Sequence, residues 1–168
     1  MTKTNAIIAI LLLLVVAGLG AALYKVRSSA FKSKLEPVHV AAAEIRGGLV
    51  VGTNYSDYAH RLQGLSSAIL RAKESGASRE AIKEYFAALD AYRDALELWG
   101  SKLEKPYYYG LPYGSGQYSP LLDAMAKKYA VSGKVSADGR ENLRVHDAVI
   151  QEIWKRANTA IDNAHNSE

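Results

Sequence analysis

An apolar run near the N-terminus constrains this chain more than any other feature. From Thr4 to Tyr24 there is no charged residue, and the centre of the run reads AIIAILLLLVVAGLGAAL. As a helix, the stretch at 6–23 would be ~27 Å long, close to the ~30 Å hydrocarbon core of a bilayer. A helix at the surface of a soluble domain is apolar along one stripe, whereas this segment is apolar all round. The sequence therefore predicts a tail at 1–5 and a transmembrane anchor at 6–24.

A secretory signal sequence is the alternative for the same segment. Lys3 provides a short basic start, and the small residues at 20–22 resemble a cleavage site. The run is longer than a usual signal core, and Lys25 and Arg27 come directly after it, which favours an uncleaved anchor. The chain has no cysteine, so a lipid anchor on cysteine is excluded.

The formal net charge of +4 is concentrated in front of the folded part. No acid occurs before Leu35, and the basic residues there are Lys3, Lys25, Arg27, Lys32 and Lys34. From Leu35 onward, 16 basic and 17 acidic residues nearly balance. We therefore expect 25–36 to be a juxtamembrane segment whose Lys25, Arg27, Lys32 and Lys34 attract anionic lipid headgroups. The domain itself lacks the basic excess that is typical of nucleic-acid binding.

The basic cluster also bears on topology. The positive-inside rule would keep the cluster, and the domain C-terminal to it, in the cytoplasm. A short N-terminal hydrophobic segment can instead direct export of the rest of the chain, which leaves a periplasmic or extracytoplasmic domain as the alternative. In both cases the prediction is a single-pass protein of the plasma (inner) membrane.

Residues 37–165 are predicted to form a small antiparallel α-helical bundle, with three long and two shorter helices. Pro37 is suited to a helix start, Gly52 to its end and Asn54 to capping the next helix. Two stripes alternate in steps of three and four residues, the spacing of near-parallel helix packing. The first consists of Tyr55, Tyr58, Leu62, Leu65, Ile69 and Ala72, and the second of Ile82, Tyr85, Leu89, Tyr92, Leu96, Trp99 and Leu103.

Later helices are expected from Pro120 and after the polar linker at 132–139. The last helix would bury Leu143, Ile150, Ile153, Trp154, Ala157, Ile161 and Ala164. We expect the residues from His165 to Glu168 to fray. Trp99 and Trp154 fall on the apolar stripes of two helices, so they are expected to be core residues close to each other.

The connection at 105–119 is rich in Tyr, Gly and Pro and is longer than the ~2–8 residues usual between bundle helices. Tyrosine with Ser and Gly is typical of recognition surfaces. The candidate partner-binding residues are Tyr107, Tyr108, Tyr109, Tyr113 and Tyr118. The alternative is a lid whose rings cover one end of the bundle.

No constellation for catalysis, cofactor binding or metal binding is evident. The chain has no thiol, no G-x-S-x-G and no phosphate-binding loop. Asp57 with His60, and Asp162 with His165, share the spacing of helical metal ligands but lack the further inward Glu residues of such sites. The sequence thus predicts a protein that is not an enzyme and needs no cofactor.

The preferred interpretation is a membrane-anchored, non-catalytic helical interaction or scaffold protein, an architecture shared by many bacterial envelope proteins. Its partner would be another protein at the membrane or a second copy. The alternative is an exported bundle that senses or binds a small molecule between its helices. In that case the ligand would lie near Tyr55, Tyr58, Tyr85 and Tyr92.

Overall fold

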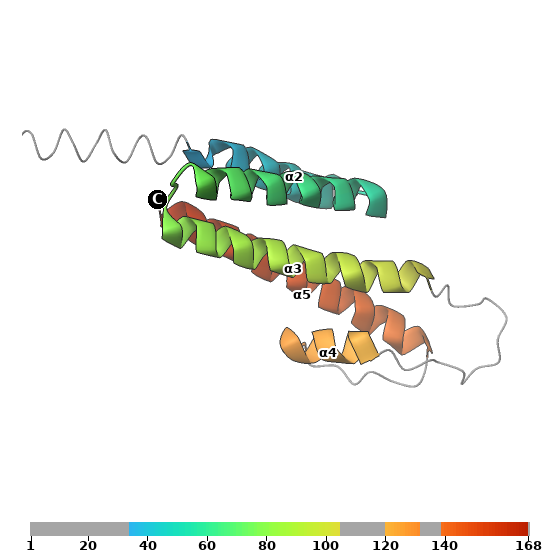
Figure 1. Ribbon diagram of the computed structural model, residues 1–168. Coiled ribbons are helices and arrows are strands. Elements are labelled where there is room, and N and C mark those ends of the chain that lie inside the picture. The colour runs from blue at the N-terminus through green and yellow to red at the C-terminus, as the bar shows by residue number, and fades with distance from the viewer. Residues whose placement is uncertain (1–33, 105–119, 132–138, 168) are drawn as a thin grey trace, which may run out of the picture.

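The computed structural model describes residues 34–104, 120–131 and 139–167, which form five helices packed as a bundle (Figure 1). The first helix covers 34–51. It is followed by α2 (Tyr55–Glu74), α3 (Arg79–Glu104), α4 (Pro120–Lys128) and α5 (Gly139–Asn166). The predicted all-α bundle is confirmed. The predicted anchor at 6–24 lies outside the described residues, and none of the described helices is long and apolar enough to cross a membrane.

Local sequence signals set the helix ends. Gly52 and Gly76 both have positive φ, 92° and 76°, which glycine adopts without a Cβ clash. The Asn54 side chain accepts a hydrogen bond of 2.8 Å from the Asp57 backbone N–H, so the predicted cap of α2 is confirmed. Ser78 caps α3 in the same way, with its hydroxyl accepting from the Ala81 N–H at 3.3 Å.

Two expected helix ends differ from the structure. The first helix already includes residue 34, so Pro37 lies inside it and does not begin it. The residues expected to fray begin at His165, whereas α5 extends through Asn166. Beyond the end of α5, the Ser167 backbone N–H donates a hydrogen bond to the Ala164 carbonyl at 3.1 Å.

The long helices are arranged up, down, up and down. The first helix and α2 form one pair and α3 and α5 the other, with α4 beside the N-terminal part of α5 (Figure 1). Among the four helices α2, α3, α4 and α5, the most extensive contact is that of α3 with α5. Both helices carry fully buried alanines, Ala88 and Ala95 on α3 and Ala157 on α5. Such small side chains let two helix backbones approach closely.

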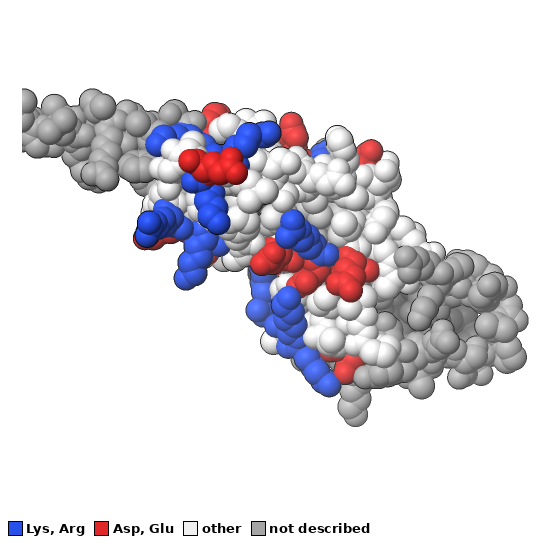
Figure 2. All heavy atoms as spheres, in the orientation of Figure 1, with Lys and Arg blue, Asp and Glu red and all other residues white. Residues whose placement is uncertain are grey.

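The core matches the predicted stripes closely. Most stripe residues of α2, α3 and α5 are buried, whereas Tyr55, Leu96, Trp99 and Trp154 are half-buried. Leu103 does not belong to the core, because 54% of its surface is exposed in the last turn of α3. The side chain of Leu143 lies outside the described residues. On the face shown in Figure 2, acidic and basic side chains lie beside one another over the bundle.

Candidate functional site

Aromatic rings from three helices form the centre of the bundle. Tyr58 of α2 lies in the middle, with ring centroids 5.8 Å from Trp99, 6.1 Å from Trp154 and 6.3 Å from Tyr92. The two tryptophan rings meet edge to face at 6.1 Å, so their expected proximity is confirmed. Tilted and edge-to-face rings at these distances attract each other beyond what their buried area contributes.

The side-chain polar atoms of Tyr58, Tyr92 and Trp154 form hydrogen bonds within the fold. The Trp154 indole N–H donates to the Tyr58 hydroxyl at 3.1 Å, and that hydroxyl donates to the backbone carbonyl of Tyr92 at 3.0 Å. The Tyr92 hydroxyl in turn donates to Oδ1 of Asn158 at 2.6 Å. The hydroxyl groups of Tyr58 and Tyr92 are therefore satisfied within the fold, as buried polar groups require.

Arg46 connects the first helix to this network. Its Nε donates to Oδ1 of Asn158 at 3.1 Å, and its terminal nitrogen donates to the Asn158 carbonyl at 2.5 Å and to Asp162 at 2.7 Å. The Asn158 side-chain oxygen thus accepts from both Arg46 and Tyr92. A guanidinium fork of this kind joins several acceptors in a defined geometry. Arg46 and Asn158 together link the first helix, α3 and α5.

Burial controls the protonation of these tyrosines. It raises the pKa of Tyr92 to about 12, although the charge of Arg46 nearby acts in the opposite direction. Burial raises the pKa of Tyr58 further, against the hydrogen bond from Trp154. Both phenols are therefore neutral at physiological pH. They serve as hydrogen-bond donors, and neither is suited to act as a base.

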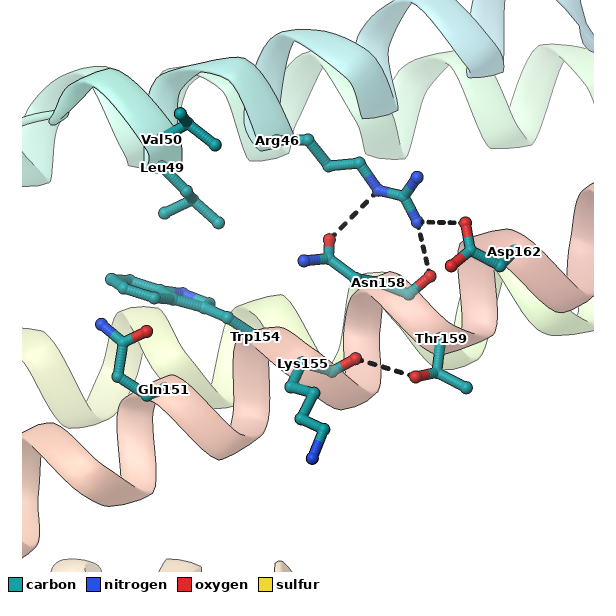
Figure 3. Close-up of a pocket in the computed structure, with 9 residues that line it drawn as sticks. All are labelled: Arg46, Leu49, Val50, Gln151, Trp154, Lys155, Asn158, Thr159 and Asp162. Atoms are coloured by element: carbon teal, nitrogen blue, oxygen red, sulfur yellow. Dashed lines mark hydrogen bonds and ion pairs between the residues drawn. The ribbon is translucent and has the colours of Figure 1, made fainter.

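A groove lies on the outside of this network, between the first helix and α5 (Figure 3). It has a volume of about 620 Å³, within the usual size range for ligand pockets. The lining residues are Arg46, Leu49, Val50, Gln151, Trp154, Lys155, Asn158, Thr159 and Asp162. Leu49 points toward Trp154 at one end, with the exposed Val50 beside it, and Arg46 bridges to α5 at the other end. The groove combines an apolar end with a charged end but brings together no nucleophile and base.

A second polar cluster attaches α4 to the bundle. Oδ2 of Asp94 accepts from Lys128 and from the Tyr129 hydroxyl, both at 2.5 Å, while Arg156 of α5 donates to the Tyr129 carbonyl at 2.7 Å. Burial, followed by the hydrogen bond to Asp94, raises the pKa of Tyr129. The cluster connects α3, the end of α4 and α5, which is a structural role.

The histidines do not assemble a metal site within the described residues, where no group of three potential ligands occurs. Asp57 accepts a hydrogen bond from the side-chain amide of Asn54 at 2.8 Å, and Asp162 pairs with Arg46. His165 packs its ring 4.4 Å from that of His39, across the seam between α5 and the first helix. Asp57 is thus engaged in helix capping, Asp162 in an ion pair and His165 in ring packing.

Most residues predicted as interaction sites lie outside the described residues. These are the tyrosines at 107–109, 113 and 118, together with Lys25, Arg27 and Lys32. Lys34 is described, and its ammonium group donates to the Gly76 carbonyl at 3.4 Å. The lipid-binding role predicted for these basic residues stays a prediction.

Sequence reasoning did not identify Arg46, Asn158 or the groove. Both residues are polar and lie next to apolar stripes, at the boundary positions of their helices. Exposed residues commonly occupy such positions, so the pattern alone gave no signal. Their roles depend on the first helix lying against α5, which is a property of the tertiary structure.

His146 of α5 is a buried polar residue, only 3% exposed, and its Nδ1 has no hydrogen-bond partner among the described residues. Burial lowers its pKa below the ordinary 6.5, and the neighbouring charge of Lys102 acts in the same direction, against Asp147. Because the unfolded chain then binds a proton more readily than the folded one, the free energy of unfolding should fall as pH drops below about 6.5. It should stop falling below the lowered pKa of the folded state.

A His146→Leu variant tests this effect, because it should flatten the pH dependence of stability between neutral and mildly acidic pH. Thermal unfolding of the full chain in detergent micelles, repeated across this pH range, provides the measurement. His60→Leu on the exposed face of α2 is the control. Equal pH slopes for the wild type and His146→Leu would contradict the assignment.

No family model matches the chain, and the searches of curated proteins and of solved structures found no similar protein.

Proposed function

We propose that this chain is a membrane-anchored, non-catalytic helical interaction protein that acts through protein–protein contacts at the membrane. The observation that supports this most directly is the difference between the two ends of the bundle. One end receives the chain from the predicted anchor, and the other carries exposed apolar side chains and the start of the Tyr-rich connection.

The anchor-side end is defined by three contacts. Lys34 reaches the Gly76 carbonyl, His39 packs on His165, and the Ser78 hydroxyl donates to the Ser167 carbonyl at 3.3 Å. The start of the first helix, the turn between α2 and α3 and the end of α5 therefore lie together (Figure 1). A membrane span at 6–24 would enter the fold at this end.

The opposite end carries the turn between the first helix and α2. Val50 and Val51, just before this turn, are 86% and 84% exposed. Tyr55 packs its ring 5.9 Å from Trp99 near the end of α3, so Glu104, where the Tyr-rich connection begins, lies at the same end. The 18 described residues of the first helix would place this end ~25 Å from residue 34. An anchored domain would thus present its apolar tip, and the residue at which the Tyr-rich connection begins, away from the anchor.

Tethering strengthens weak contacts of this kind. An anchor confines the domain to the bilayer, which raises its effective concentration toward any partner in the same membrane. No catalytic chemistry is needed for a protein that acts in this way. We place the domain on the cytoplasmic side, in agreement with the basic cluster directly after the apolar run.

A small-molecule-binding bundle is the competing proposal. It would place a ligand among the seam tyrosines, but Tyr58, Tyr85 and Tyr92 are fully buried in the packed core. The groove between the first helix and α5 would have to serve instead. It is an open channel on the surface, with charges of both signs from Arg46, Lys155 and Asp162.

The proposal is tested by crosslinking in native membranes and co-purification of the full chain, with a topology reporter fused after Glu168. We expect the chain in the membrane fraction, a cytoplasmic reporter signal and a crosslinked partner. Changing Tyr107, Tyr108 and Tyr109 to Ser should reduce that crosslink several-fold, because aromatic contact area would be lost. The matched variant with Phe at the three positions should retain most of it.

Two outcomes would count against this role for the tyrosines. Unchanged crosslinks together with a lower thermal stability would identify the segment as a lid on the bundle. A chain that is recovered entirely outside the membrane fraction would overturn the anchored function itself.

A further inference from the structure

The first helix carries an apolar stripe on the face that points away from the core. Its members are Val40, Ala43, Gly47 and Val50, in steps of three, four and three residues. All four are exposed, Val40 by 50% and Val50 by 86%, and Val51 beside them by 84%. The core face of the same helix consists of other residues, namely Leu35, Val38, Ala42 and Ile45. This helix therefore has two apolar faces, and the fold buries only one of them.

Gly47 is not explained by the fold of a single chain. Apart from the neighbouring backbone of its own helix, the described residues place no atom within 4 Å of where its Cβ would be, as is also true of Gly64 in α2. The adjacent Gly48 differs, because the guanidinium group of Arg61 lies over it and donates to the Glu44 carbonyl. A glycine inside a helix costs about 1 kcal/mol relative to alanine. The missing side chain at 47 would serve a purpose if another backbone approached this face.

We propose that a second copy of this chain packs on the stripe, with the two 34–51 helices parallel. Steps of three and four residues are the seam spacing of two-stranded coiled coils. Ala43 and Gly47 are four residues apart, the spacing by which small residues allow two helices to approach closely. No charged residue interrupts the stripe between Val40 and Val50, whereas Glu44 and Arg46 lie to either side of it.

The parallel orientation is a consequence of the predicted membrane anchor, which precedes the first helix in the chain. In this respect the inference rests on the proposed function. If the segment at 6–24 spans the bilayer, all copies emerge on the same side and in the same direction. Their first helices then point the same way, and the stripe of one copy faces the stripe of another in register. Glu36 lies on the same face one turn earlier, so the contact begins at Val40, beyond the repulsion between two carboxylates.

Cysteine scanning is a direct test, because the chain contains no cysteine of its own. Single variants Val40→Cys, Ala43→Cys, Gly47→Cys and Val50→Cys would be oxidised in native membranes as full-length protein. A disulfide forms only where two Cα atoms come within about 7 Å, so dimers should form several-fold more at these positions than off the stripe. Glu44→Cys on the same helix and Lys83→Cys on α3 are the exposed off-stripe controls.

A second variant separates dimerisation from folding. Gly47→Leu adds a side chain where the fold has room, so thermal stability should stay the same or rise. Introduced into the Val40→Cys chain, it should reduce the disulfide-linked dimer several-fold, because the two helices can no longer approach closely. An undiminished dimer in this double variant would overturn the proposed packing.

Other occupants of the stripe give different results. Any of three results would overturn the proposal. The first is equal dimer formation on and off the stripe. The second is a crosslink to a different protein at these positions, and the third is protection of the stripe by lipid without any dimer. Membrane fractionation of the same samples tests the anchor separately. Failure of the proposed function is therefore distinguishable from failure of the dimer.

Discussion

Replacing Tyr58 with Ala should lower the free energy of unfolding by about 3–5 kcal/mol, the usual cost of deleting a large buried aromatic side chain. Tyr58 is fully buried and lies between Tyr92, Trp99 and Trp154. Its loss would leave a cavity between α2, α3 and α5. It would also remove the acceptor of the Trp154 indole N–H. Thermal unfolding of the full chain in detergent micelles, followed by circular dichroism, measures the effect.

A Tyr58→Phe variant keeps the experiment informative if the Ala variant fails to fold. Phe keeps the ring but loses the hydroxyl that accepts from Trp154 and donates to the Tyr92 carbonyl. The expected loss is about 1–3 kcal/mol, the usual cost of leaving buried polar groups without a partner. The fluorescence of both tryptophans should also change, since both rings contact Tyr58. If Tyr58→Phe were as stable as the wild type, the hydrogen bonds of this hydroxyl would not stabilise the bundle.

Replacing Ala88 with Leu should destabilise the chain by about 1–3 kcal/mol, the usual cost of adding methylene groups to a filled core. Ala88 is fully buried on α3, the helix that packs most extensively on α5. A larger side chain there would force the packed helices apart. Thermal unfolding of this variant beside the wild type provides the measurement.

The adjacent residue is a closely matched control for this substitution. Ala87 lies in the same helix but is exposed, so Ala87→Leu makes the same substitution without placing the added side chain in the core. We expect its stability to stay within about 0.5 kcal/mol of the wild type, as is usual for surface substitutions. Equal losses at both positions would show that helix propensity, and not core packing, controls the response.

Much of the fold could be predicted from the sequence, because its signals are local. The caps at Asn54 and Ser78 and the positive φ of Gly52 and Gly76 depend on neighbouring residues only. The buried stripes reflect the period of the α-helix. The proximity of Trp99 and Trp154 was expected for the same reason, since each lies on a stripe that faces the core.

The candidate site was much less predictable. Arg46 and Asn158 are 112 residues apart and meet only because the first helix lies against α5. The burial of His146 and the exposure of Leu103 likewise depend on which helices cover these positions. A helical period identifies an inward face, but it does not identify the neighbouring helix that this face meets.

The sequence by itself thus determined that the described chain is helical, where most of its helices begin and end, and which face of each is apolar. Backbone capping and helical periodicity act over a few residues, so they are visible in the sequence. Only the tertiary structure decided that Tyr58 and Tyr92 are joined in one hydrogen-bond network, and that Arg46 closes it. It also decided that one helix keeps a second apolar face exposed at Val40, Gly47 and Val50. The network arises from side chains that meet across helices, and the exposed face is one that no described helix covers, so neighbouring residues along the chain determine neither.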